Sequence, residues 1–286
     1  ANESVKFEGY LDLFASLYNQ LLKDLEKEGV EYIQLDEPAF VLDLSNKEVD
    51  LALRTYDKVM EGVNNLKVIV NTYYESLSNY DKLINLPVAG FGLDFVVNGE
   101  NLENIKKYGF RSDKVLIAGV VSGRDPWKTN LKETANLIKE ISNYVKLENI
   151  ILSNAAPLFH LPVSLEPEKG HLPEDLLNVL SFADERLVEL KLLKDYFVDG
   201  VELPDTDIKS IISKFNNEKV RQTVEQLKDS EVGRKTPFEE RYKKQMELLK
   251  LPLLPTTTIG SFPQTKEVRK YRADYKAGRI SQEEYE

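Results

Sequence analysis

Two adjacent acidic residues, Asp36 and Glu37, follow the strand-like run VEYIQL and precede Pro38. Paired carboxylates at the end of a strand can exchange protons with a substrate or hold an ammonium group. A strand that ends in carboxylates is also what a βα barrel presents to a ligand at its carboxyl-terminal face. A structural role is the plainer interpretation, in which the pair caps the next turn or forms hydrogen bonds within the barrel mouth.

A second candidate is the run Ser122-Gly123-Arg124-Asp125, which follows the apolar strand KVLIAGVV. A glycine-containing loop with an arginine after a barrel strand can bind a phosphate or a carboxylate group. The simpler interpretation is a salt bridge within the loop region, from Arg124 to Asp125 or to Glu37.

A third candidate lies near the end of the sequence, at Thr258-Ile259-Gly260-Ser261. The strand is expected to end at Gly260, whose missing side chain lets a ligand approach the backbone. Ser261 adds a hydroxyl and a backbone N–H that can bind a carboxylate. A plain strand-to-loop turn is the alternative. The charge-rich segment at 266–276 is expected to be the solvated face of a helix.

The composition narrows the chemistry further. The sequence has no cysteine, which excludes disulfides and thiolate metal sites, and its only histidines are His160 and His171. A histidine-rich zinc site is therefore not expected. His160 lies between Phe159 and Leu161 and is expected to be a packed structural residue.

The charge and hydropathy patterns also limit the function classes. The net charge of -10 disfavours a nucleic-acid partner, which requires a basic surface. No apolar run reaches the roughly 18 residues of a membrane span. The first residues, ANESVKFEGY, lack the pattern of a signal peptide. We expect a cytoplasmic protein, and the 42% of hydrophobic residues is enough to build a core.

Strand-like and helical segments alternate over the first half of the chain. The continuous apolar runs VIV and VLIAGVV indicate strands buried on both faces, and the alternation indicates parallel pairing. Five strands suit a doubly wound open sheet as well as part of an eight-stranded (β/α)8 barrel, and periodicity does not choose between them. The expected strands lie at 30–35, 66–74, 88–96, 114–127 (with the loop that follows) and 149–157, and the expected helices at 14–28, 49–61, 77–83, 101–108 and 131–145.

The second half of the chain differs from the first in its charge and in its expected secondary structure. From Pro167 to Leu249 it is highly charged, and we expect long amphipathic helices that cover one side of the barrel. Pro252 and Pro255 then bracket a linker.

Four segments, in chain order, resemble cobalamin-independent methionine synthase: YIQLDEPAF, NAAPLFHLPVSL, LSFADERLVELKLL and LPTTTIGSFPQTKEVRK. The resemblance covers essentially the whole chain, and the last segment is the most specific. It implies two face-to-face (β/α)8 barrels, the first a degenerate copy of the second. It also implies methyl transfer from 5-methyltetrahydropteroyl polyglutamate to homocysteine, with zinc in the second barrel and no cobalamin.

The resemblance implies a domain organisation and one binding site. Residues 1–250 would be the later part of the N-terminal barrel with its last five strands, 251–257 the linker, and 258–286 the first βα unit of the catalytic barrel. The chain would be an internal segment of a longer enzyme. Ile259, Gly260 and Ser261 match the family's turn that contacts homocysteine.

The same resemblance indicates which sequence positions would carry zinc ligands if this barrel bound a metal ion. Histidine and cysteine are expected there, whereas the chain offers carboxamide, hydroxyl and methyl groups, which do not make a zinc site. We expect no metal site and no catalytic residue here, with the zinc ligands beyond Glu286. The positions concerned are Asn71, Thr72, Tyr73 and Tyr74 after one strand and Asn154, Ala155 and Ala156 at the last.

Three functions therefore stay open. The chain is part of the methyltransferase and supplies scaffold, barrel–barrel interface and one edge of the homocysteine pocket, without turnover of its own. Alternatively, it is a non-catalytic half-barrel that binds or assembles, or it belongs to a related zinc methyltransferase acting on another thiol. A natural half-barrel would need protected sheet edges, and the sequence shows no strong protection. We therefore expect a truncated or nicked chain that does not fold stably in isolation.

Overall fold

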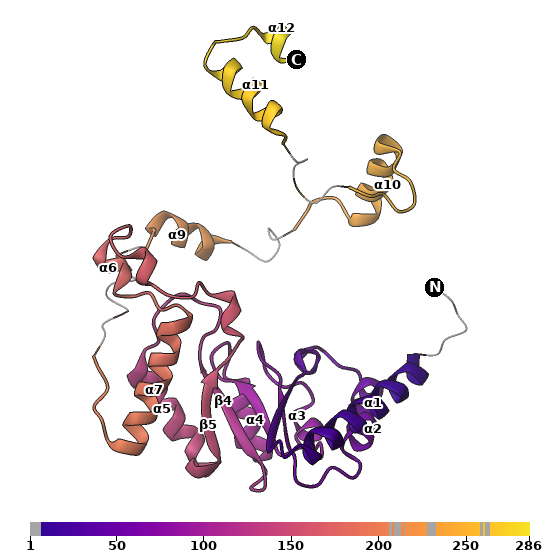
Figure 1. Ribbon diagram of the computed structural model, residues 1–286, viewed down its shortest axis with the longest axis vertical. Coiled ribbons are helices and arrows are strands. Elements are labelled where there is room, and N and C mark those ends of the chain that lie inside the picture. Colours follow the sequence, from indigo (N-terminus) through magenta and orange to yellow (C-terminus); the bar gives the residue numbers. More distant parts are fainter. Residues whose placement is uncertain are drawn as a thin grey trace. The chain divides into compact units, whose positions relative to one another are not determined.

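The computed structural model describes residues 7–205, 208, 213–214, 216–227, 233–257, 260 and 264–286 (Figure 1). Contacts between residues divide the chain into two units, Ala1–Asn216 and Asn217–Glu286, which are considered separately. Of the predicted homocysteine turn, Gly260 is described, whereas Ile259 and Ser261 lie outside the described residues.

The first unit contains a parallel sheet of five strands in the order β1-β2-β3-β4-β5. All five predicted strands and their parallel pairing are confirmed. Their bounds are β1 (Tyr32–Asp36), β2 (Lys67–Asn71), β3 (Gly90–Asp94), β4 (Val115–Val121) and β5 (Ile150–Asn154).

The strand order resolves the ambiguity that periodicity left open. A doubly wound sheet reverses its strand order at a switch point, and this reversal places helices on both faces. Here the order never reverses, so successive right-handed crossovers place their helices on one face. This is the order of strands in a (β/α) barrel.

The core agrees with this one-sided arrangement. Alternate residues of the central strands, such as Val68 and Val70 in β2 and Phe91 and Leu93 in β3, join one buried cluster with helix residues. Adjacent strand residues point to opposite faces, so the intervening positions line the other face of the sheet.

Glycines on that other face bring the strands close together. A Cβ atom at Gly90 would lie 2.4 Å from the carbonyl oxygen of Val115. A Cβ atom at Gly119 would lie 2.6 Å from the Cα of Ala155. Because no side chain fits at these positions, this face can be strongly concave, as the inside of a barrel must be.

Helices of the first unit follow the sheet in sequence. The prediction for the first helix is too short, since the helix begins seven residues before Phe14. In Figure 1, α5 and α7 lie beside β5, and the contacts of α7 with α5 and β5 agree. The bounds are α1 (Phe7–Lys27), α2 (Asn46–Met60), α3 (Tyr80–Leu83), α4 (Glu100–Tyr108), α5 (Leu131–Ser142), α6 (Glu174–Leu177) and α7 (Ala183–Asp199), with 3-10 turns at Pro38–Val41, Leu147–Asn149, Leu158–His160 and Glu166–Glu168.

Local sequence explains where several of these helices start and stop. Ser45 and Glu48 form a capping box at the start of α2, each satisfying a backbone N–H of the other. Helix α7 ends at Gly200, whose φ of 70° is in the left-handed region that glycine adopts without strain.

The second unit consists of helices and connecting segments. It contains α9 (Glu218–Gln226), α10 (Phe238–Leu249), α11 (Lys266–Lys276) and α12 (Gln282–Tyr285). Residues 251–257, the predicted linker, are exposed and have no regular secondary structure. Among the described residues of the whole chain, no helix is both long and apolar enough to cross a membrane.

Candidate functional site at the carboxyl ends of the strands

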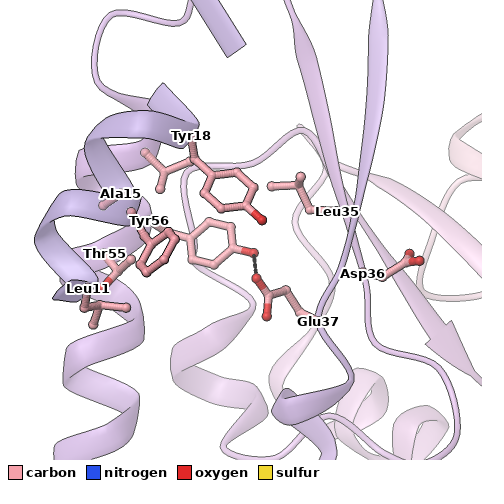
Figure 2. Close-up of a pocket in the computed structure, with 10 residues that line it drawn as sticks. Leu11, Ala15, Tyr18, Leu35, Asp36, Glu37, Thr55 and Tyr56 are labelled. Atoms are coloured by element: carbon pink, nitrogen blue, oxygen red, sulfur yellow. Dashed lines mark hydrogen bonds between the residues drawn. The ribbon is translucent and has the colours of Figure 1, made fainter. Parts of the chain in front are cut away.

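The acidic pair at the end of β1 does not act as a pair. Figure 2 shows the side chains of Asp36 and Glu37 on opposite sides of the chain, as expected for consecutive residues of an extended segment. The Asp36 carboxylate accepts a hydrogen bond of 2.7 Å from Gln34 Nε2. Glu37 instead accepts one of 2.8 Å from the hydroxyl of Tyr56 on α2.

Glu37 borders a pocket between α1, α2 and β1 (Figure 2). Burial raises the pKa of Glu37, the negative charge of Asp36 adds to this effect, and the Tyr56 hydrogen bond opposes it. The Glu37 hydrogen bond lies between the sheet and its helices, so it is not the predicted bonding within the barrel mouth. The predicted capping role is wrong, because the Glu37 side chain makes no capping hydrogen bond to the 3-10 turn that follows. The geometry favours a structural role over acid–base work.

The loop after β4 is held by its own serine. Ser122 Oγ accepts hydrogen bonds from the backbone N–H of Arg124 (3.2 Å) and of Asp125 (3.0 Å). Gly123 is required here, since a Cβ atom would lie 1.8 Å from the carbonyl oxygen of Ala156.

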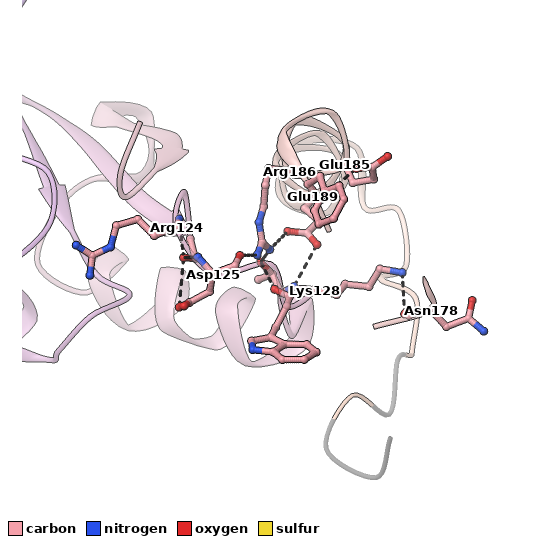
Figure 3. Close-up of polar contacts among 11 residues, drawn as sticks. Arg124, Asp125, Lys128, Asn178, Glu185, Arg186 and Glu189 are labelled. Carbon is pink, nitrogen blue, oxygen red and sulfur yellow. Dashed lines mark hydrogen bonds and ion pairs between the residues drawn. The ribbon is translucent and has the colours of Figure 1, made fainter. Parts of the chain in front are cut away.

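Arg124 does not form the predicted salt bridge. Figure 3 shows its side chain pointing away from Asp125, and it has no ion pair with any residue that the structure describes. The guanidinium lies over the ring of Tyr74 instead, 5.7 Å from the ring centre. This contact is a cation–π interaction, and it leaves the charge of Arg124 available to an anionic group.

A buried arginine on α7 fixes the segment that follows this loop (Figure 3). Arg186 is fully buried, and its guanidinium donates to the backbone carbonyls of Asp125 and Trp127. It also donates to Thr129 Oγ1 at 2.7 Å and forms an ion pair of 2.7 Å with Glu189. The arginine thereby ties α7 to the carboxyl end of β4 with charge-assisted hydrogen bonds.

Sequence reasoning missed the roles of Arg186 and Glu189, although a signal was present. The two residues are three apart on a helix, and Leu193 lies on the same face at the next turn. Opposite charges at this spacing on an apolar face indicate a buried ion pair rather than a solvated one.

The segment after β2 is strained. Tyr73 and Tyr74 have φ values of 55° and 59°, in the left-handed region that side chains with a Cβ rarely adopt. Tyr74 donates its backbone N–H to Ala155 O at 3.2 Å, so the strained segment is tied to the end of β5.

His160 is not the packed residue that the sequence predicts. It is exposed, and its Nε2 lies 3.1 Å from the Tyr74 hydroxyl. The ring centre of Phe159 is 4.3 Å from that of His160. Tyr74, Phe159 and His160 therefore form one group of neighbouring rings.

These strand ends do not fit a zinc ion. The segments after β2 and β5 carry amide, hydroxyl, phenol and methyl groups, which are not the nitrogen and sulfur donors that zinc prefers. Within the described part of the chain, no three His, Cys, Asp or Glu residues are grouped so that they could hold a metal. His160 and Tyr74 add only one ring nitrogen.

Comparisons with known proteins identify the family. A family model described as "Cobalamin-independent synthase, N-terminal domain" matches residues 1–146, and one described as "Cobalamin-independent synthase, Catalytic domain" matches residues 254–286. The chain belongs to the cobalamin-independent synthase family. The family description also agrees with the prediction that cobalamin is not used.

Two curated relatives carry the same name, 5-methyltetrahydropteroyltriglutamate–homocysteine methyltransferase. The protein of Thermodesulfovibrio yellowstonii is 52% identical over 270 residues, and that of Bacillus subtilis is 42% identical over 280 residues. Each match covers 94% of this chain and 36% of the relative, so the chain spans about a third of their length. A solved B12-independent methionine synthase from Shewanella sp. W3-18-1 aligns at 22% identity with a TM-score of 0.46, over 68% of this chain and 58% of that one.

Proposed function

We propose that this chain is part of a methyltransferase that moves a methyl group from 5-methyltetrahydropteroyl polyglutamate to homocysteine and so forms methionine. The observation that carries the proposal is the 52% identity over nearly the whole chain to a relative named for this reaction. A cytoplasmic location belongs to the same proposal.

The chain contributes structure rather than reacting groups in this proposal. Its strand ends hold structural hydrogen bonds, and its described residues offer no metal site. The zinc ion of the enzyme would be held by residues outside this sequence, where it would bind the homocysteine thiol and lower its pKa. This chain would supply scaffold and interdomain interface.

The domain organisation is part of the proposal. Residues 1–250 belong to the N-terminal barrel, 251–257 form the linker and 258–286 begin the catalytic barrel. The barrel-type strand order and the exposed, irregular linker support this division.

The N-terminal barrel would be closed by further βα units of the same polypeptide. Strands β1 and β5 each pair on one side only within the described residues. Helix α1 beside β1 carries a row of half-exposed apolar side chains, which such units would cover. These side chains are Tyr10, Leu13, Phe14, Leu17, Tyr18 and Leu21.

The edge of the homocysteine pocket is proposed at Ile259, Gly260 and Ser261. Gly260 has a φ of +86°. The backbone at this position therefore adopts a left-handed conformation that suits glycine.

Two substitutions in the full-length enzyme test this proposal. Ser261→Ala removes a hydroxyl, and Gly260→Ala adds a methyl group where the amino acid approaches. We expect each to lower kcat/KM for homocysteine by roughly tenfold or more, Ser261→Ala because one hydrogen bond to a charged group is lost and Gly260→Ala because the added methyl group obstructs the amino acid.

Gly278→Ala is the matched control. Gly278 also has positive φ (68°) and open space around its Cβ position, so it carries the same backbone strain outside the proposed pocket. An equal loss of kcat/KM in Gly278→Ala would contradict the pocket assignment. Methyl transfer to a different thiol in preference to homocysteine would contradict the proposed reaction.

A further inference from the structure

The feature that points to a further site is the carboxylate of Asp94 at the end of β3. The side chain is only 2% exposed. Its Oδ1 accepts hydrogen bonds from the backbone N–H groups of Val96 (2.7 Å) and Val97 (3.1 Å). Its Oδ2 is buried and has no hydrogen-bond partner among the residues that the structure describes. A buried acceptor without a donor costs free energy. A hydrogen-bond donor from a bound molecule would remove this cost.

Asp94 borders a cavity from which such a donor can come. The cavity has a volume of about 220 Å³ and lies at the carboxyl ends of β3, β4 and β5. This is room for about seven water molecules at ~30 Å³ each, and it is smaller than a pocket for a drug-sized ligand. The polar side chains that line it are Asp94, Ser122, Arg124 and Asp125, and its walls include Val96, Val97, Ala155 and Ala156.

The charges around the cavity are of both signs. Asp94 and Asp125 bring carboxylates to it, and Arg124 brings a guanidinium that is not engaged in an ion pair within the described residues. Burial raises the pKa of Asp94, whereas the backbone donors of Val96 and Val97 lower it by favouring the ionised form. The negative charge of Glu75 raises the pKa further, and the positive charge of Arg124 lowers it.

We propose that this cavity binds a small α-amino acid as a zwitterion. Its ammonium group donates to the unpartnered oxygen of Asp94, and its carboxylate meets the guanidinium of Arg124. The side chain of the amino acid lies against the small walls at Ala155 and Ala156.

Other ligand classes suit the cavity less well. An inorganic anion would satisfy Arg124 but would place negative charge beside two carboxylates. A divalent cation would need several oxygen ligands, and the described residues contain no group of three acidic or histidine side chains that could hold one. A zwitterion is complementary to both signs of charge at once. The inference does not depend on the homocysteine pocket proposed at residues 259–261.

The test uses methyl NMR of the full-length protein with 13C-labelled alanine methyl groups. Ala155 and Ala156 line the cavity, so their signals report on this site even when an amino acid also binds elsewhere. The probe is L-2-aminobutyrate. Two analogues serve for comparison. Butanoate lacks the ammonium group of L-2-aminobutyrate, and propylamine lacks the carboxylate of L-2-aminobutyrate. We expect saturable shifts of both signals with L-2-aminobutyrate and at least ~10-fold weaker binding of each analogue.

Variants locate the two charge contacts. Asp94→Asn keeps an acceptor for Val96 and Val97 but removes the charge, and Arg124→Gln removes the guanidinium. We expect each to weaken binding of L-2-aminobutyrate by ~10-fold or more. The exposed pair Arg111 and Asp113 provides matched controls, because Arg111→Gln and Asp113→Asn make the same chemical changes elsewhere on the surface.

The outcomes are distinct. Weaker binding in the two site variants, with unchanged binding in the controls, supports the proposal. Propylamine binding as tightly as L-2-aminobutyrate would show a site for amines and would overturn it. Absence of any shift at Ala155 and Ala156 in the folded wild-type protein, at ligand concentrations up to roughly 50 mM, would also overturn it, since useful affinities lie well below that range.

Discussion

At the scale of single residues, the most informative side chain is Arg186. Its guanidinium is fully buried and reaches two backbone carbonyls, Thr129 and Glu189 at the same time. Removing one member of a buried ion pair leaves the other charge uncompensated, which costs more than the pair contributes when it is intact. The loop that carries Arg124 thus depends on a residue more than 60 positions later in the chain.

We expect Arg186→Met to lower the free energy of unfolding by about 3–5 kcal/mol. The double variant Arg186→Met/Glu189→Met should be less destabilised than the single one, because no unpaired charge remains. Urea denaturation of the full-length protein measures both values. Lys194→Met is the control, since Lys194 pairs with acidic residues on the exposed side of the same helix, and its loss should change the free energy of unfolding much less than Arg186→Met does. A double variant that is as unstable as Arg186→Met alone, or less stable, would contradict this account.

At the scale of elements, the sheet is shaped by glycines that face away from the helices. A Cβ atom at Gly119 of β4 would meet the backbone of Ala155, which cannot move without disturbing β5. A Cβ atom at Gly92 of β3 would meet the side-chain amide of Asn71, which can rotate away. The neighbour of Gly119 is therefore fixed backbone, whereas the neighbour of Gly92 is a side chain that can move.

We expect Gly119→Ala to destabilise the protein by about 1–3 kcal/mol, as overpacking does, and Gly92→Ala to cost less. Thermal and chemical denaturation of the two variants, each against the wild type, compare them directly. Gly233→Ala is the control, because its Cβ would meet nothing within 4 Å. A larger loss for Gly92→Ala than for Gly119→Ala would be inconsistent with backbone contact as the limiting factor.

The start of β4 carries a second element-scale feature, a buried lysine. Lys114 Nζ donates to the carbonyls of Leu86 and Val88, each at 2.6 Å, and links the start of β4 to the segment before β3. Burial lowers the pKa of Lys114 to about 8 from its usual 10.5. Between these two values the unfolded chain binds a proton that the folded chain has lost.

The free energy of unfolding should therefore gain a contribution from Lys114 as the pH rises from about 8 towards 10.5. Below pH 8 the buried ammonium opposes folding by its full desolvation cost. Lys114→Met should be less stable overall, since two carbonyls lose their donor, and its stability should rise less with pH. Urea denaturation at pH 7, 8, 9 and 10 measures the difference between wild type and variant. A difference that stays constant over this range would refute the assignment.

At the scale of the whole molecule, the sheet of the first unit has two open edges within the described residues. Parallel strands with unpaired N–H and C=O groups at both edges invite pairing with another chain. The apolar row on α1 lies at one of these edges, and α7, which contacts β5 at the other, carries exposed apolar side chains such as Leu187, Val188 and Val198. Such surfaces are usually covered in a stable protein.

We expect the 286-residue chain, produced alone, to self-associate and to unfold without a sharp cooperative transition. Light scattering after size-exclusion chromatography and urea unfolding followed by circular dichroism measure the two properties. The full-length protein, in which we propose that further βα units close the barrel, is the comparison and should unfold cooperatively. Reversible, cooperative unfolding of a monomeric 286-residue chain would show that the open edges are tolerated.

Sequence alone determined the elements and the family of this protein. The apolar runs of β1 to β5 and the periodic helices between them are local patterns, and each depends on side chains within a few residues of one another. The segment TTTIGSFPQT predicted the start of a second domain in the same local way, since a continuous motif can be recognised without knowledge of the fold. The absence of cysteine likewise excludes thiolate metal sites from this chain in any fold, because it removes the ligand itself.

Only the tertiary structure decided the strand order, the separation of Asp36 from Glu37 and the partners of Arg124 and Arg186. Each depends on residues that are far apart in the chain and meet only when the sheet forms. The unpartnered oxygen of Asp94 is the clearest case, because a hydrogen-bond deficit exists only after neighbouring strands have removed water from the carboxylate. Burial is a property of the folded chain, and it converts an ordinary strand-end aspartate into a candidate binding group.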